Sequence, residues 1–209
     1  MLVALYAAII TFLTYATVYG FRKGFTVCTF DGLSYAGIGY KTWLVVSQVL
    51  GYACSKFYGI RFISELKKIG RGKLILSLTG ISWLALLLFA IVPAPYNIVL
   101  MFINGFPLGM IWGVVFSYVE GRSATDFIGA ALSVSFIFSS GFVKSVAETL
   151  RINFSLSEWW VPFATGLAFA IPLVFFSYLL EKILAVFELL FYSVRGFLAR
   201  CRSGISVKR

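Results

Sequence analysis

The chain contains no histidine and only three cysteines, Cys28, Cys54 and Cys201, which are widely spaced. Because His and Cys bind zinc and haem iron in most proteins, almost no ligands remain for such a metal. The sequence also lacks an HExxH motif, a Ser/His pair, a phosphate-binding loop and a dinucleotide-binding glycine motif. We therefore expect no metal, no cofactor and no enzymatic activity.

Charged residues are scarce as well. They make up 12% of the chain, whereas 60% is hydrophobic and the mean hydropathy is +0.94. A soluble domain of this length could not cover so much apolar surface, and continuous apolar runs do not fit the alternating pattern of an outer-membrane barrel. The net charge of +10 lies mainly in flanks and tail, so no nucleic-acid partner is needed. The composition predicts an all-α polytopic protein embedded in membrane lipid.

Six apolar segments have about the 20 residues that a membrane-spanning helix needs. They form a predicted six-helix transmembrane domain over residues 1–180. The beginning of the chain lacks the charged start of a signal peptide and stays apolar for too long, so it reads as a spanning helix. The predicted spans are 2–30, 43–63, 74–92, 97–119, 127–147 and 160–180.

The rest of the chain, residues 181–209, has apolar residues at helical spacing and a basic end. This pattern is typical of an amphipathic helix on the cytoplasmic leaflet. The alternatives are a short seventh span or part of a linker. With the N-terminus inside, twelve Lys and Arg residues lie in inner loops and tail, against two, Lys41 and Arg151, in outer loops. The bias predicts a protein of the cytoplasmic (inner) membrane with both termini in the cytoplasm.

Several cations fall inside the spans, where each costs roughly 3 kcal/mol or more unless it faces a partner, a cavity or a pathway. Arg22 and Lys23 could end the first helix and reach the outer headgroups. The apolar run, however, continues to Phe30. A polar stripe along one helical face favours an interior position for Arg22; it consists of Tyr15, Tyr19, Arg22 and Thr26.

Two more cations lie further along the chain. Lys56, one turn after Tyr52, is far from both ends of the second span, although a lysine can also extend to the inner headgroups. Lys144 lies one turn before Glu148, and an ion pair with it is at least as good an explanation as contact with a ligand. In the fourth span Gly105, Gly109 and Gly113 share a face, which predicts close helix packing.

Two short motifs resemble those of a known family. YGFRKGF, from Tyr19 to Phe25, resembles an Arg-Lys-x-Phe element in a first helix, and YACSKF, from Tyr52 to Phe57, a Tyr-x-x-Ser-Lys-Phe element in a second. NGFPLGMIWG resembles a glycine-rich stretch of a fourth helix. On these motifs the chain resembles the N-terminal six-helix half of a major facilitator superfamily carrier of the organophosphate–phosphate antiporter type, and most of all a bacterial family of unassigned function related to them.

The resemblance implies that Arg22 and Lys56 match residues that bind or attract phosphate, while Ser139 stands near the place of a functional histidine. The predicted binding residues are Arg22, Lys56, Tyr19, Tyr52 and Lys144. We expect a carrier, or half of one, that moves a small anionic solute by alternating access, with a second six-helix half or a second copy as its partner. The alternatives are a non-transporting membrane scaffold or assembly subunit, or an inactive carrier fragment.

Overall fold

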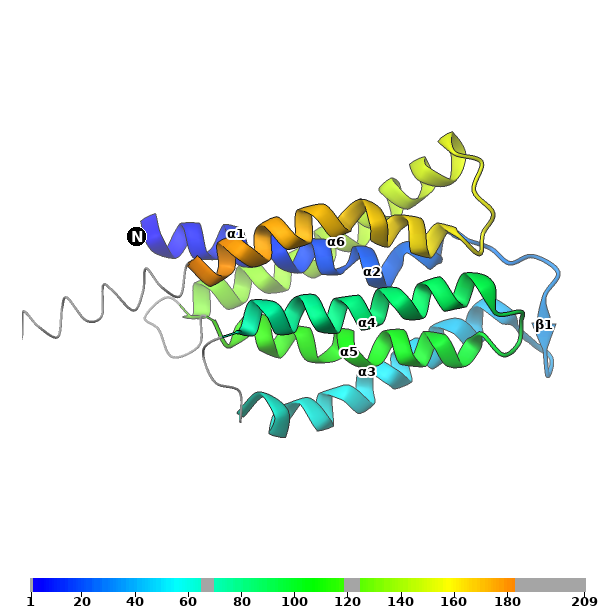
Figure 1. Cartoon of the computed structure of the whole chain (residues 1–209), viewed down its shortest axis with the longest axis horizontal. Coiled ribbons are helices and arrows are strands. Elements are labelled where there is room, and N and C mark those ends of the chain that lie inside the picture. Colours follow the sequence, from blue (N-terminus) through cyan, green and yellow to red (C-terminus); the bar gives the residue numbers. More distant parts are fainter. Residues whose placement is uncertain (1, 65–69, 119–124, 183–209) are drawn as a thin grey trace, which may run out of the picture.

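The computed structural model describes residues 2–64, 70–118 and 125–182. Long helices run side by side along one axis of the molecule (Figure 1). The elements in chain order are α1 (Leu2–Val18), α2 (Gly20–Lys23), a 3₁₀ helix η1 (Gly24–Val27), β1 (Ser34–Tyr35), β2 (Ile38–Gly39), α3 (Tyr40–Ser64), α4 (Arg71–Ile91), α5 (Ile98–Phe116), α6 (Thr125–Asn153) and a last helix, Val161–Lys182.

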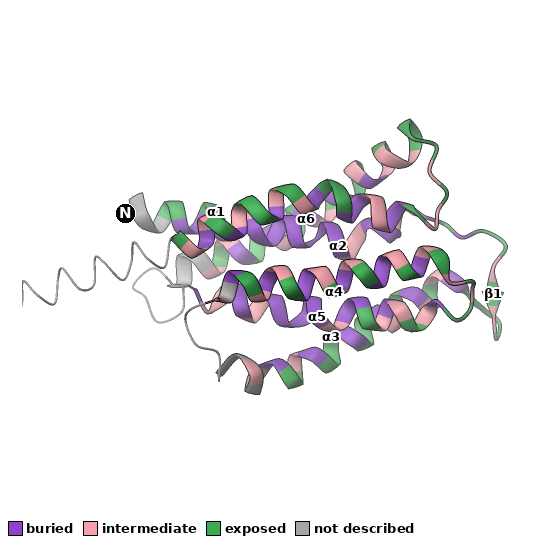
Figure 2. Ribbon diagram, viewed as in Figure 1, coloured by how far each residue is buried: buried purple, intermediate pink, exposed green. Residues whose placement is uncertain are grey.

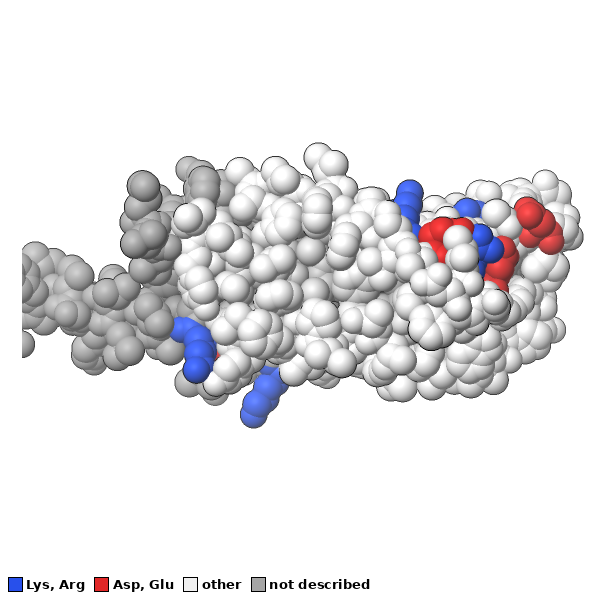
Figure 3. Space-filling view, turned by 90° about the horizontal axis from the view of Figure 1, so that it is seen from above, with Lys and Arg blue, Asp and Glu red and all other residues white. Residues whose placement is uncertain are grey.

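Four helices of the described residues are long and apolar enough to cross a membrane: Gly72–Ile91, Ile98–Phe116, Gly129–Asn153 and Val161–Lys182. Many of their large hydrophobic side chains point outward; Ile137 and Ile171 are each 81% exposed. Exposed residues run along the outer faces of these helices (Figure 2). The side of the molecule in Figure 3 has no charged residue over its middle. The chain is therefore a mostly helical integral membrane protein, as the composition predicted.

The predicted helix boundaries hold to within a few residues for four segments, and the turn predicted at Pro93 and Pro95 is present between α4 and α5. The fifth segment is longer than the predicted 127–147, because α6 continues to Asn153. The predicted tail, 181–209, falls almost entirely on residues 183–209, which lie outside the described part of the chain.

The prediction of one continuous helix over 2–30 was wrong. α1 and α2 are separated at Tyr19, whose backbone angles stay helical, and the chain then tightens into the 3₁₀ helix η1, which ends at Val27. Gly20 and Gly24 lie at this break, where a methyl group would collide with Phe169 and Thr165 of the last helix. The two glycines therefore let the first segment pack closely against the last helix, and the break divides the predicted polar stripe.

The connection between η1 and α3 was predicted as a loop but contains a small β-hairpin. Ser34 pairs with Gly39, and Tyr35 with Ile38, in antiparallel register. Ala36 and Gly37 between them have φ values of 53° and 75°. Two left-handed residues in a two-residue connection are typical of a type I′ turn, which suits the twist of a hairpin. The hairpin lies at the end of the molecule opposite the N-terminus (Figure 1).

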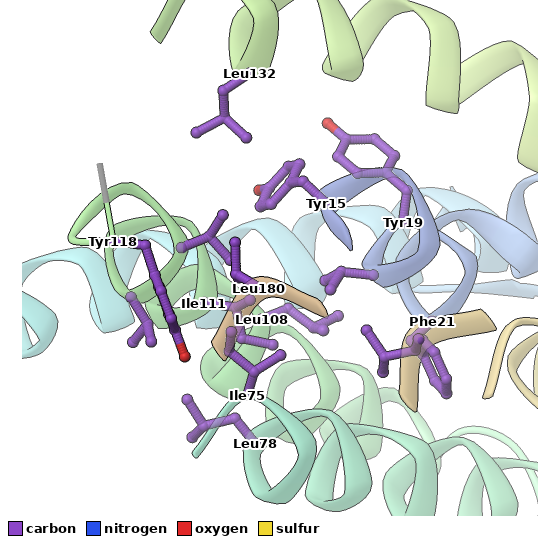
Figure 4. Packing of buried hydrophobic residues seen from close by; sticks show 14 of the residues in the cluster. Tyr15, Tyr19, Phe21, Ile75, Leu78, Leu108, Ile111, Tyr118, Leu132 and Leu180 are labelled. Carbon is purple, nitrogen blue, oxygen red and sulfur yellow. The ribbon is translucent and has the colours of Figure 1, made fainter. Parts of the chain in front are cut away.

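Two packing features fix the position of the central helices. Methyl groups at Gly105 and Gly109 of α5 would overlap atoms of α3, namely the Gln48 carbonyl oxygen and the Ser55 hydroxyl. The predicted packing role of these two glycines is thus confirmed, since only glycine allows so close an approach. Figure 4 shows the adjoining core, in which Ile75, Leu108 and Leu180 come from α4, α5 and the last helix.

Candidate functional site

Arg22 lies in α2, immediately before the chain tightens into η1. Its guanidinium carbon is 4.1 Å from the centre of the Tyr52 ring of α3 and 5.7 Å from that of Tyr19. The side chain is half-buried. A guanidinium over an aromatic face gains about 0.5–2 kcal/mol, and more as water is excluded. Arg22 therefore points toward α3, the interior position that its sequence context favoured.

Lys56 approaches the same ring from one turn further along α3. Its ammonium nitrogen lies 5.0 Å from the centre of the Tyr52 ring and 4.8 Å from that of Trp112 in α5. One tyrosine ring thus joins the two predicted cations, and Trp112 extends the aromatic surface around Lys56. Sequence spacing placed Lys56 with Tyr52 but gave no sign of Trp112, because the fourth-helix motif was interpreted only for its glycines.

The described residues provide no counter-charge here. Among them, no carboxylate lies within ion-pair distance of Arg22 or Lys56, and no acceptor is within hydrogen-bond distance of the Lys56 ammonium. The indole N–H of Trp112 is buried and likewise finds no acceptor in this part of the chain. A guanidinium, an ammonium and an indole N–H are all donors, and donors of this kind bind anionic oxygens.

Aromatic rings form one wall of the site, toward α6. Tyr15 and Tyr19 lie next to each other on the first segment, and both contact the Phe136 ring, with ring centres 5.0 Å and 5.9 Å away. Figure 4 shows the two tyrosines between their own helix and α6. Ser139, which matches the position of the antiporter histidine, is fully buried on α6, and its hydroxyl has no partner among the described residues.

Lys144 does not join the cluster of Arg22, Lys56, Tyr19 and Tyr52. It is exposed on α6, and its charge acts on the half-buried Lys23 beside Arg22. The ion pair considered for it with Glu148 is absent from the described residues, because Glu148 pairs with Arg151 at 2.5 Å. Lys144 therefore adds positive potential near the break in the first segment rather than a direct contact.

A second group of polar side chains lies beneath Arg22, and the sequence analysis did not select it. The side-chain amide of Gln48 in α3 donates to the Arg22 carbonyl oxygen at 3.1 Å. The amide of Asn104 in α5 donates to the Phe21 carbonyl oxygen at 3.1 Å. Both amides are buried. An amide side chain inside an apolar run is a signal that could have identified each of them, because such residues are costly in lipid.

At the hairpin end, Glu158 joins the connection after α6 to the end of η1. Its carboxylate accepts hydrogen bonds from the backbone N–H groups of Thr29 (3.1 Å) and Phe30 (2.6 Å), and from the Thr29 hydroxyl (3.0 Å). Burial acts to raise the pKa of Glu158, but these hydrogen bonds and the charge of Arg151 hold that pKa below its usual value. Acidic residues gather at this end (Figure 3). The described residues contain no group of three His, Cys, Asp or Glu side chains that could bind a metal ion.

Comparison with known proteins gives one family and no close relative. The chain matches no curated protein and no solved structure. The resemblance to major facilitator carriers therefore stays a prediction. A family profile matches residues 24–186, a range that begins at η1 and includes Lys56 and the last helix but not Arg22. The chain belongs to this family, a family of unknown function (DUF5690).

Proposed function

We propose that this protein is a membrane carrier, or half of one, for a small anionic solute that binds between Arg22 and Lys56. The observation that supports this most directly is a pair of donors, the Lys56 ammonium and the Trp112 indole N–H, for which the described residues provide no acceptor. Tyrosine and tryptophan faces lower the cost of holding a cation in the membrane, but they bring no negative charge. A visiting anion would provide the missing acceptors for the Lys56 ammonium and the Trp112 indole.

The arrangement of the helices is consistent with six spans. The connections around 28–39, 92–97 and 154–160 lie at one end of the molecule, and the N-terminus lies at the other (Figure 1). With 17 residues, α1 alone is shorter than a standard span, and α3 contains charged residues. Both run alongside the other helices. We propose that both cross the cytoplasmic membrane, with both chain termini in the cytoplasm.

A complete carrier of this type would consist of two such bundles. Secondary transporters of the major facilitator type rock two halves against each other around a site near the middle of the membrane. The half-buried state of Arg22, Tyr52 and Lys56 in this single bundle fits a site that a second half, or a second copy of the chain, would close. By this account the aromatic wall of Tyr15, Tyr19 and Phe136 would form one side of the solute path.

Anion binding by the purified chain in detergent tests the proposal. Inorganic phosphate, sulfate and succinate are titrated separately by calorimetry at low ionic strength. We expect at least one of them to bind, and Lys56→Ala to raise its Kd by about tenfold or more, since hydrogen bonds to charged groups contribute about 1.5–3 kcal/mol. Absence of binding for all three probes, or an unchanged Kd in Lys56→Ala, would reject the carrier and favour a membrane scaffold.

Lys182→Ala is the matched control. Lys182 also lies over a tyrosine ring, with its ammonium 4.9 Å from the centre of the Tyr178 ring, but both residues belong to the last helix. The substitution removes the same charge and the same kind of ring contact at a different place. A Kd that rises equally in Lys182→Ala and Lys56→Ala would show a general effect of positive charge and not a site at Lys56.

A further inference from the structure

At the break in the first segment, backbone carbonyl groups are bound by side chains of other helices. Where an α-helix tightens into a 3₁₀ helix, the regular hydrogen bonding of the backbone is interrupted. A backbone carbonyl without a partner is costly inside a membrane. The carbonyl oxygens of Phe21 and Arg22, at this break, accept hydrogen bonds from Asn104 and Gln48.

Asn104 is the centre of this network. Its amide nitrogen also donates to the backbone and hydroxyl oxygens of Ser82 in α4, at 3.0 Å and 2.8 Å, and its own backbone oxygen accepts from the Ser82 hydroxyl at 2.7 Å. Its side-chain oxygen accepts from Gln48 at 2.8 Å. Asn104 is completely buried. One side chain of α5 thus connects α2, α3 and α4, and each of its polar atoms is used.

Two residues of α3 contact Arg22, one at its backbone and the other at its guanidinium. Gln48 and Tyr52 are four residues apart and therefore lie on the same face of that helix, one turn from each other. Gln48 binds the backbone carbonyl of Arg22, while Tyr52 lies beneath its guanidinium. Any rotation or shift of the backbone at Arg22 would break the first contact and misdirect the second.

We propose that Gln48, Asn104 and Ser82 are positioning residues that aim the guanidinium of Arg22 at the Tyr52 ring, beside Lys56. None of the three touches the guanidinium itself, so they act through the backbone of Phe21 and Arg22. This inference rests on the proposed anion site for its functional meaning. The geometry that it describes can nevertheless be measured without any anion.

The test uses the full chain with 3-fluorotyrosine incorporated at position 52, observed by ¹⁹F NMR in detergent. Arg22→Gln defines the change in chemical shift that follows loss of the guanidinium from the ring. Gln48→Met removes both amide donors at nearly constant volume, and we expect it to produce at least half of that change. Ser47→Ala is the control, because Ser47 is the neighbouring residue of α3 and binds the Ile98 carbonyl oxygen instead. Its spectrum should match that of the parent protein.

Ser82→Ala keeps the test decisive if Gln48→Met fails to fold, as judged by circular dichroism and gel filtration. It removes one partner of Asn104 and leaves both carbonyl contacts possible, so we expect a smaller change in the same direction. Thr79→Ala, one turn earlier in α4, is its control, since the Thr79 hydroxyl donates to the Ile75 carbonyl oxygen of its own helix. An unchanged ¹⁹F shift in whichever of the two variants folds would overturn the positioning role.

Titration with inorganic phosphate separates this inference from the proposed function. If phosphate binds the parent protein, we expect Gln48→Met to raise the Kd for phosphate by about tenfold, because the Arg22 guanidinium would no longer be held in position. If the ¹⁹F shift changes but phosphate does not bind the parent protein, positioning stands and phosphate is not a ligand. If phosphate binds equally well to Gln48→Met and the ¹⁹F shift is constant, the network has only a packing role.

Discussion

The guanidinium carbon of Arg22 lies 4.1 Å from the centre of the Tyr52 ring, although the two residues belong to different helices. Lys56 lies over the same ring. Tyr52 therefore contacts two positive charges in a part of the chain where the described residues offer no carboxylate. Like charges repel more strongly as the surroundings become less polar. An anion between them would relieve that repulsion, which is the physical basis of the proposed carrier.

Two substitutions of Lys56 should distinguish the effect of its positive charge on uptake from the effect of its donor geometry. Lys56→Ala is expected to abolish uptake of an anionic solute by the complete carrier in proteoliposomes while expression stays normal. Lys56→Arg retains the charge but should still impair uptake, because a planar guanidinium and a compact ammonium present different donors. Uptake rates equal to those of the parent protein in Lys56→Ala, for every anion tested, would leave Lys56 with a structural role only.

Gly105→Ala should destabilise the bundle by about 1–3 kcal/mol, the usual cost of overpacking. The added methyl group would overlap the Gln48 carbonyl oxygen and push α5 away from α3. Unfolding in denaturant, followed by circular dichroism in detergent, measures the free energy of unfolding. Gly141→Ala in α6 is the control, because in the described part of the chain no atom outside that stretch of α6 lies within 4 Å of the added methyl group. Equal stability of the two variants would contradict the close packing of α3 and α5.

Glu158 should make stability depend on pH in the acid range. Its pKa in the folded protein is below the ordinary value of 4.5. Its contribution is therefore complete above about pH 4.5, where the carboxyl group is ionised in both states, and is lost as the pH falls through the folded-state pKa. Thermal unfolding between pH 7 and pH 3 measures this. Glu158→Gln should be less stable than the parent protein at pH 7 and should approach it at the acid end; a constant difference would refute the linkage.

Topology can be tested with reporters. A reporter fused after Arg209 should be active in the cytoplasm, since Lys and Arg are concentrated in the predicted inner loops and the tail. A second fusion within the hairpin connection, at Gly37, should be active only on the opposite side. Activity of the terminal fusion outside the cytoplasm would mean that the orientation, or the number of spans, is wrong.

The sequence was sufficient for the features that depend on apolar length and on spacing within one helix. The positions of α3, α4, α5 and the last helix follow from continuous apolar runs, and the pairing of Lys56 with Tyr52 follows from helical spacing. The close approach at Gly105 and Gly109 was also predicted, because small residues on one face allow it.

The features that depend on which residues of other helices become partners could not be predicted. At the break, Gly20 and Gly24 pack against the last helix, and Gln48 and Asn104 donate to the carbonyl oxygens of Arg22 and Phe21. Nothing in the local sequence specifies those partners. For the same reason Trp112 was not recognised beside Lys56, and Glu148 pairs with Arg151 rather than with Lys144.

The most direct test of the central claim is whether an anion lies next to the Lys56 ammonium. Solid-state NMR of the ¹⁵N-lysine-labelled protein in lipid, with inorganic phosphate added, detects ³¹P near each ammonium through dipolar dephasing. The Lys56 signal is assigned by its loss in Lys56→Ala. The account predicts dephasing of the Lys56 signal that disappears in Arg22→Gln, with no dephasing of Lys182. A Lys56 signal that phosphate leaves unchanged, in protein shown by calorimetry to bind phosphate, would contradict it.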